Sequence, residues 1–127
     1  QRKQGQMDRW NIITILNYLS NKEEEQIIAN KIKKMNNKTG KEVIKSMVAT
    51  ADLSRAGFIN GDISTVMSPR TVLTWAENYL MFNDAEYAFK LSFLNRCDEL
   101  ERPIIEEYFQ RSFGIDISDA KVANVKE

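Results

Sequence analysis

The sequence predicts a mainly α-helical protein, with one N-terminal strand followed by a compact bundle of about five helices. Apolar residues recur three and four positions apart over most of the chain, and only two prolines and five glycines interrupt its 127 residues. The exception is WNIITILNY at residues 10–18, which is β-branched and aromatic with partial alternation. Because a lone strand cannot satisfy its own backbone, this strand is expected to join a sheet outside the chain or to lie at an edge.

The composition is that of a single domain with an ordinary core. Apolar residues make up 43% of the chain and charged residues 28%. Eighteen basic and eighteen acidic residues cancel, so no global field favours nucleic acid or an acidic membrane surface as a partner. The apolar runs are too short to cross a bilayer, and we find no signal peptide. The single cysteine, Cys97, excludes an internal disulfide and fits a cytoplasmic location. Because the chain begins with glutamine, we expect a fragment or a processed product.

Several kinds of catalytic chemistry lack their usual residues. The chain has no histidine, which removes the commonest general base and the commonest transition-metal ligand, and we predict no metal site. The acidic runs KEEEQ and CDELER and the pair Glu106–Glu107 are interpreted as solvated faces and i,i+4 pairs. Cys97 precedes an acidic run, which should raise its pKa, and is interpreted as a core residue. No phosphate-binding loop of the G-x-x-x-x-G-K-[ST] type is present.

The first predicted helix, SNKEEEQIIANKIKKM, begins at a capping box made by Ser20 and Glu23. Its inner face is expected to consist of Ile28, Ile32 and Met35.

A second capping box is predicted at Thr39 and Glu42, after the loop NNKTG. We expect Gly57 and Gly61 to break the helix that follows. Its inward residues are predicted to be Val43, Ile44, Met47, Val48 and Ala51.

Three further helices are predicted from their start and stop residues. Ser68 is the expected N-cap of one helix and Asp84 of the next, while Pro103 begins a last helix that Gly114 ends. The tail at residues 115–127 is expected to fray. The core-facing residues of the first two of these helices are predicted to be Val72, Leu73, Ala76, Tyr79, Leu80, Tyr87, Ala88, Leu91, Phe93 and Leu94.

Arg70 is the residue that most suggests a binding site. Ser68 and the first helical residue, Pro69, place it in the first turn of a helix, where the helix dipole disfavours a positive charge. Free N–H groups and an arginine at one helix end suit an anion, and a phosphate best. The alternative is that Arg70 extends into solvent without a ligand. A second arginine, Arg9, directly precedes the predicted strand and is interpreted as an exposed residue at a sheet end.

Three motifs carry a resemblance to a known family: GQMDRW, FINGDISTVMSPRTVLTWAEN and LSFLNRCDELERPIIEEYFQRSFG. Together they resemble the C-terminal part of the CobS-type subunit of aerobic, ATP-dependent cobaltochelatase, an AAA+ ATPase group related to magnesium chelatase and to MoxR-type ATPases. The resemblance runs from about Gly5 to about Ile115. It implies an AAA+ lid fold, with residues 1–19 as the end of the AAA+ core, residues 20–114 as the helical lid and residues 115–127 as the tail.

The resemblance also implies roles for individual residues. Arg9 matches the arginine finger, which would act in trans on a neighbouring subunit's phosphoryl group. Arg70 matches the sensor-2 arginine that contacts nucleotide phosphate, with Ser68 and Pro69 beside it, and whether it acts in cis or in trans stays open. The full-length protein would use ATP and Mg, form a hexameric-type ring and act with the other cobaltochelatase subunits. This chain alone binds neither ATP nor Mg and is expected to be inactive.

The implied function is a ligase activity: an ATP-driven insertion of cobalt into a corrin ring, hydrogenobyrinic acid a,c-diamide, in cobalamin biosynthesis. Two other functions stay open. The chain could be the lid of another MoxR-type remodelling ATPase, or a helical interaction module without nucleotide contact.

Overall fold

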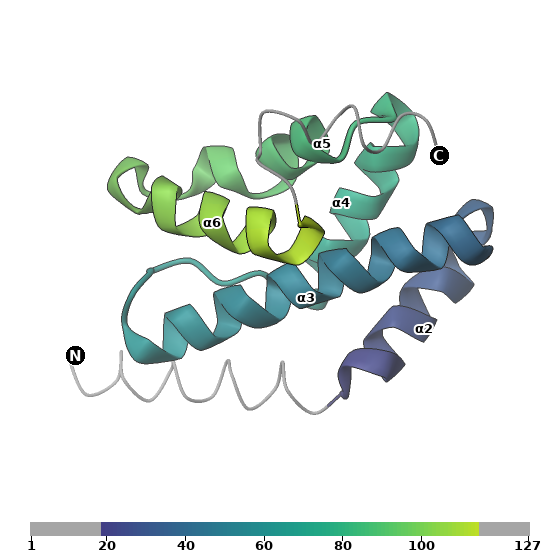
Figure 1. The fold of residues 1–127 in the computed structure, drawn as a ribbon, viewed down its shortest axis with the longest axis horizontal. Helices are drawn as coiled ribbons and strands as arrows, with labels where there is room; N and C mark the ends of the chain where they lie inside the picture. Colours follow the sequence, from purple (N-terminus) through teal and green to yellow (C-terminus); the bar gives the residue numbers. More distant parts are fainter. Residues whose placement is uncertain (1–18, 115–127) are drawn as a thin grey trace.

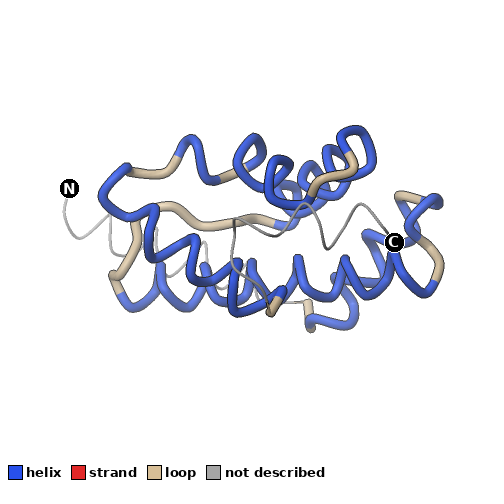
Figure 2. The backbone as a smooth tube through the Cα atoms, turned by 45° about the horizontal axis from the view of Figure 1, so that its top comes forward, coloured by secondary structure: helices blue, strands red, loops and turns tan. Residues whose placement is uncertain are grey.

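The computed structural model describes residues 19–114, which form a bundle of five α-helices (Figure 1). Within this range all regular structure is helical, and the longest loop without a helix is at residues 61–68 (Figure 2). The α-helices are α2 (Asn21–Lys31), α3 (Lys38–Asn60), α4 (Pro69–Phe82), α5 (Ala85–Ser92) and α6 (Arg102–Phe113), and the 3-10 helices are η1 (Lys33–Met35), η2 (Leu94–Arg96) and η3 (Glu99–Glu101). The predicted helical bundle is confirmed. Three predicted features lie outside the described residues: the strand at residues 10–18, Arg9 and the tail at residues 115–127.

The longest helix, α3, runs through the centre of the bundle (Figure 1). Helices α2, α4 and α6 each pack against α3, and α4 packs against α5 across a two-residue connection. The amphipathic faces of these helices therefore meet in one core.

The centre of the core is aromatic. Trp75 is fully buried, and its ring centroid lies 4.8 Å from that of Phe89 and 6.0 Å from that of Phe109. Its indole N–H donates a hydrogen bond to the carbonyl oxygen of Ala85 over 3.1 Å. Burial of the rings and this hydrogen bond hold α4, α5 and α6 together.

Most of the predicted helix ends are confirmed. The Ser20 hydroxyl accepts from the Glu23 N–H at 3.2 Å, and the Glu23 carboxylate accepts from the Ser20 N–H at 2.8 Å. The Asp84 carboxylate accepts from the N–H of Tyr87 at 3.0 Å. Gly114 ends α6 in the left-handed region with φ 72°.

The predicted capping box at Thr39 and Glu42 is wrong. The N-cap of α3 is Asn37, whose side-chain oxygen accepts from the Gly40 N–H at 2.8 Å. The Asn37 amide also donates to the carbonyl oxygen of Lys34 over 2.9 Å, and this ties the cap to η1. The helix therefore begins at Lys38, and Thr39 lies inside its first turn.

The predicted break at Gly57 is also wrong, because α3 continues to Asn60 and ends at Gly61 with φ 85°. Gly57 is buried, and the hydroxyl group of Tyr108 on α6 lies where a Cβ atom on Gly57 would be. The glycine thus allows a close approach between two helices, and that packing offsets its poor helix propensity.

The predicted core faces are partly right. The predicted inward residues of α3 are buried except Val43, which is partly buried, and Ile28, Ile32 and Met35 are buried although α2 ends at Lys31. In α5, Ala88 is buried as predicted, but Tyr87 and Leu91 are 46% and 44% exposed, so the prediction is wrong at these two positions. The buried face of α5 is Ala85, Ala88, Phe89 and Ser92. The reason is that Phe89 packs against Trp75, which rotates α5 toward that ring.

The prediction that Leu80 faces the core is wrong, because it is 37% exposed, and Leu73 is only partly buried. The other predicted positions of this region are buried as expected: Val72, Ala76, Tyr79, Phe93 and Leu94.

Candidate functional site at the start of helix α4

The start of α4 has the geometry that its sequence predicts. Ser68 is extended, with φ −84° and ψ 167°, and its hydroxyl oxygen accepts from the N–H of Thr71 at 3.2 Å. Pro69 occupies the first turn, where an N–H is not needed for the helix. The next residue, Arg70, is exposed. The positive end of the helix and a guanidinium group are thus both accessible at one place.

Arg70 lines an open hollow of about 430 Å³ between α2 and the first turns of α4, which we call the α2–α4 groove. Its walls are mainly apolar, and two cationic side chains, Lys31 and Arg70, lie on its two sides. None of the ion pairs formed among residues 19–114 involves either cation. A groove with apolar walls and unpaired cations suits an anionic ligand that has an apolar part. The lining residues are Leu19, Glu24, Ile27, Ile28, Lys31, Pro69, Arg70 and Leu73.

A buried ion pair lies at the same place. Glu24 lines the groove and is itself 2% exposed, and its two carboxylate oxygens accept from the two terminal nitrogens of Arg55, each over 2.9 Å. Arg55 is 4% exposed, and its Nε donates to the carbonyl oxygen of Met67 over 2.9 Å. The carboxylate of Glu24 is therefore fully engaged by Arg55.

Another arginine lies close to the α4 start. The guanidinium group of Arg96, on η2, donates to the hydroxyl oxygen of Thr71 over 3.1 Å and lies 5.8 Å from the centroid of the Phe93 ring. Thr71 is the residue after Arg70, so a second positive charge lies near the same helix end. The sequence reasoning did not select Arg96.

Arg55 and Glu24 were also missed, although the sequence carries a signal for them. Arg55 follows Val48 and Ala51 at helical spacing on the apolar face of α3, and Glu24 lies four residues before Ile28 on the inner face of α2. A charge on a core-facing stripe requires a partner of opposite sign. The pattern therefore indicates two buried charges, but not that they meet.

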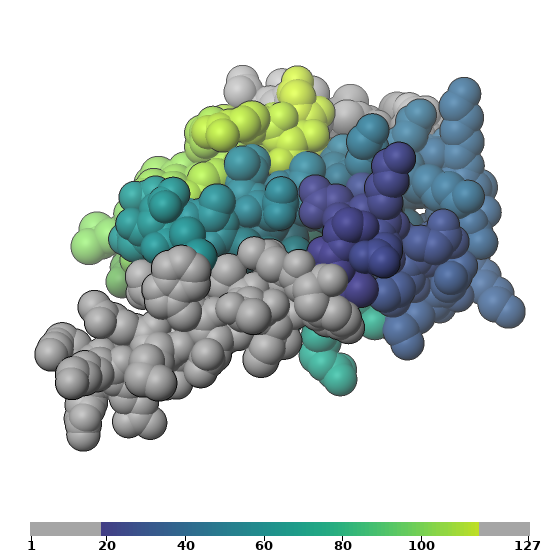
Figure 3. Space-filling model, turned by 90° about the horizontal axis from the view of Figure 1, so that it is seen from below, coloured from purple at the N-terminus to yellow at the C-terminus, as the bar shows by residue number. Residues whose placement is uncertain are grey.

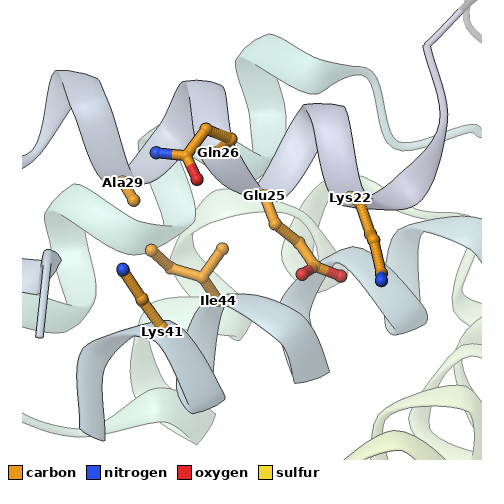
Figure 4. A pocket seen from close by; sticks show the side chains of 6 residues that line it. All are labelled: Lys22, Glu25, Gln26, Ala29, Lys41 and Ile44. Atoms are coloured by element: carbon orange, nitrogen blue, oxygen red, sulfur yellow. The ribbon is translucent and has the colours of Figure 1, made fainter. Parts of the chain in front are cut away.

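A smaller hollow of about 200 Å³ lies between α2 and α3, and Figure 4 shows its side chains. Lys22, Glu25 and Gln26 come from α2, and Lys41 and Ile44 from α3. This hollow has less than half the volume of the α2–α4 groove, and the carboxylate of Glu25 lies among its lysines.

The other candidate groups are structural. Cys97 is 3% exposed, and burial raises the pKa of its thiol to about 11, with a smaller raising effect from Glu101. The predicted direction is confirmed, but burial and not the acidic run is the main cause. Glu107 is exposed and pairs with Arg111 four residues on, as predicted for the pair Glu106–Glu107. The prediction that KEEEQ is a solvated face is wrong at Glu24, because this residue is buried against Arg55.

Two negative findings concern residues 19–114. No helix in this range combines the length and apolar character that crossing a membrane requires. Within the same residues, no three acidic, cysteine or histidine side chains gather closely enough to hold a metal ion.

The fold and site define a helical domain with an exposed arginine at the start of α4 and a lysine on the facing helix α2, neither of them in an ion pair within residues 19–114. The chain is 54% identical over 125 residues, 98% of its length, to the aerobic cobaltochelatase subunit CobS of Sinorhizobium sp. As its motifs predict, the chain is similar to a CobS-type cobaltochelatase subunit over nearly its whole length. It spans 37% of the length of that relative. No protein-family model and no solved structure matches the chain.

Proposed function

We propose that this chain is the lid part of an AAA+ ATPase subunit that drives cobalt insertion into a corrin ring. Two observations support the proposal. The relative is a cobaltochelatase subunit, and 98% of this chain aligns with it. The exposed Arg70 in the first turn of α4 supports the functional part of the proposal, because a guanidinium group there is accessible to an anionic ligand.

In this proposal, Arg70 binds a phosphate group of ATP through its guanidinium group. The N-terminal end of α4 adds a favourable field for that negative charge, and Lys31 adds a second cation from α2. The residues between 19 and 114 that the structure describes offer Mg²⁺ no ligand set, so no step of the proposal depends on a metal bound there.

The lid would move as a rigid body when the bound ATP is hydrolysed. Arg70 lies on α4, and α4 packs directly against α3 and α5, so a force applied at Arg70 reaches the rest of the bundle. A phosphate contact that exists with ATP and changes after hydrolysis would thus shift the whole helical bundle. Arg9, which lies outside the described residues, would supply the arginine finger to a neighbouring subunit of a ring.

The test compares Arg70→Ala with Arg111→Ala in the full-length subunit that the proposal implies. Arg111 is an exposed arginine on α6 whose partner is Glu107, so it controls for the loss of one surface charge. We expect Arg70→Ala to raise the dissociation constant for ATP about tenfold or more, because hydrogen bonds to charged groups contribute about 1.5–3 kcal/mol. Arg111→Ala should leave that constant unchanged.

Two outcomes would contradict the proposal. Equal ATP affinity for both variants and the wild-type subunit would remove Arg70 from the nucleotide site. A second outcome is that nucleotide binding depends on Arg70 but the subunit forms no complex with a cobaltochelatase large subunit. This outcome would indicate a different client for the same ATPase.

A further inference from the structure

The guanidinium group of Arg55 joins three segments that are distant in sequence. It binds Glu24 on α2 through two hydrogen bonds of 2.9 Å and the carbonyl oxygen of Met67 through a third of the same length. Figure 3 shows the beginning of α2, in purple, against the second half of α3, in teal, which is the region of this pair. Three of the five N–H groups of this guanidinium group thus donate inside the protein.

The backbone of Met67 is held from both sides by α3. Its carbonyl oxygen accepts from Arg55, and its N–H donates to the hydroxyl oxygen of Ser54 over 3.3 Å. The Met67 side chain is fully buried. The following residue, Ser68, is the N-cap of α4, so the anchored residue lies only three positions before Arg70.

We infer that Glu24 and Arg55 form a positioning pair for Arg70. Arg55 fixes the segment from which α4 begins, and the same group fixes Glu24, whose helix supplies the opposite wall of the α2–α4 groove. The pair thus sets the separation between Arg70 and the α2 wall. The inference rests on the proposed function, because it concerns how the phosphate-binding arginine is held.

A buried ion pair is poorly explained by stability alone. Apolar residues of similar volume often replace such a pair with no loss of stability, whereas the removal of one partner leaves an unpaired buried charge. An apolar side chain cannot donate to the carbonyl oxygen of Met67. The geometric restraint is therefore the contribution that an arginine makes here and that a methionine or leucine could not make.

The experiment separates the two contributions with the double variant Glu24→Leu/Arg55→Met. The matched control is Glu107→Leu/Arg111→Met, which changes the same residue types at an exposed pair on α6. Hydrogen exchange of the Met67 and Thr71 amides is measured in the 127-residue chain, and ATP affinity in the full-length subunit. Each variant is also made in an Arg70→Ala background.

We expect the double variant to remain folded, with at least about tenfold faster exchange at Met67 and Thr71 and an ATP affinity reduced about as much as by Arg70→Ala. In the Arg70→Ala background it should cause no further loss of affinity, because the positioned group is already absent. The control should change neither measurement.

A folded double variant with wild-type exchange and wild-type ATP affinity would overturn the inference. If the double variant does not fold, Arg55→Lys tests the same pair, since one ammonium group cannot replace the planar group that binds both Glu24 oxygens and the Met67 carbonyl oxygen. Unchanged exchange at Met67 and Thr71 would then contradict the inference. If Arg70→Ala itself leaves ATP affinity unchanged, the proposed function fails, and the exchange data still decide whether the pair positions the α4 start.

Discussion

The hydroxyl group of Tyr108 lies in the space that a Cβ atom on Gly57 would occupy, so α6 packs on α3 at a point that requires glycine. Both residues are buried, and α3 is helical on both sides of the contact. This contact explains why a residue with poor helix propensity lies inside a 23-residue helix.

We predict that Gly57→Ala destabilises the domain. Alanine would favour the helix by about 0.5–1 kcal/mol, but overpacking of a filled site costs about 1–3 kcal/mol. The net loss should be about 1 kcal/mol in the free energy of unfolding, measured by urea denaturation. Tyr108→Phe removes the group that the new methyl would meet, so the double variant should lose less than the sum of the single losses. Strict additivity would show that the two positions are not in contact.

The capping of α3 can be tested at two positions. Asn37→Ala removes the acceptor for the Gly40 N–H, and an N-cap loss of this kind costs about 1 kcal/mol. Thr39→Ala changes a residue within the first turn and should alter stability by less than about 0.5 kcal/mol. Thermal or urea unfolding of both variants gives the comparison. A larger loss for Thr39→Ala than for Asn37→Ala would support the capping box that the structure excludes.

The buried thiol predicts a dependence of stability on alkaline pH. Burial raises the pKa of Cys97 to about 11, above its ordinary value of 9.0, while Arg96 and Arg102 lower it and Glu101 raises it. Between these two pH values the unfolded thiol loses its proton before the folded one does. Stability from this group is therefore fully present below pH 9.0 and declines as the pH rises to about 11.

The measurement is the urea midpoint across this pH range for the wild type and for Cys97→Ala. The wild type should lose more stability than the variant, although the pKa of Tyr108 is also raised by burial and contributes a decline to both. Cys97 should also react slowly with a thiol reagent at pH 8 until the chain unfolds. Parallel pH profiles together with rapid labelling of the folded protein would contradict the assignment.

Arg9 gives a prediction for the full-length ring. Arg9→Ala should leave nucleotide affinity nearly unchanged but reduce turnover greatly, since arginine fingers contribute roughly 10³–10⁵ in rate. Rings that mix Arg9→Ala subunits with subunits disabled in their own phosphate loop should regain partial activity, because some interfaces then combine an intact loop with an intact finger. If every mixture is as inactive as either parent while subunits demonstrably exchange, Arg9 does not act in trans.

The helix caps and helix ends could be predicted from the sequence because they depend on local interactions. The caps at Ser20, Ser68 and Asp84 each involve a hydrogen bond between residues three positions apart. Such contacts depend on the nearest neighbours in the chain, as does the left-handed end of α6 at Gly114. The position of Arg70 in the first turn of α4 follows from the same rules and is confirmed, whereas its role as a phosphate ligand stays a prediction.

Features that join residues distant in the sequence depend on how the helices pack together. Glu24 and Arg55 are 31 positions apart, and no local rule pairs them, because their meeting depends on how α2 folds back on α3. The buried face of α5 depends on where Trp75 places its ring, and the continuity of α3 through Gly57 depends on Tyr108. In the last two cases, packing between helices outweighs a local preference of at most about 1 kcal/mol, since burial of a large apolar side chain contributes about 1.5–3 kcal/mol.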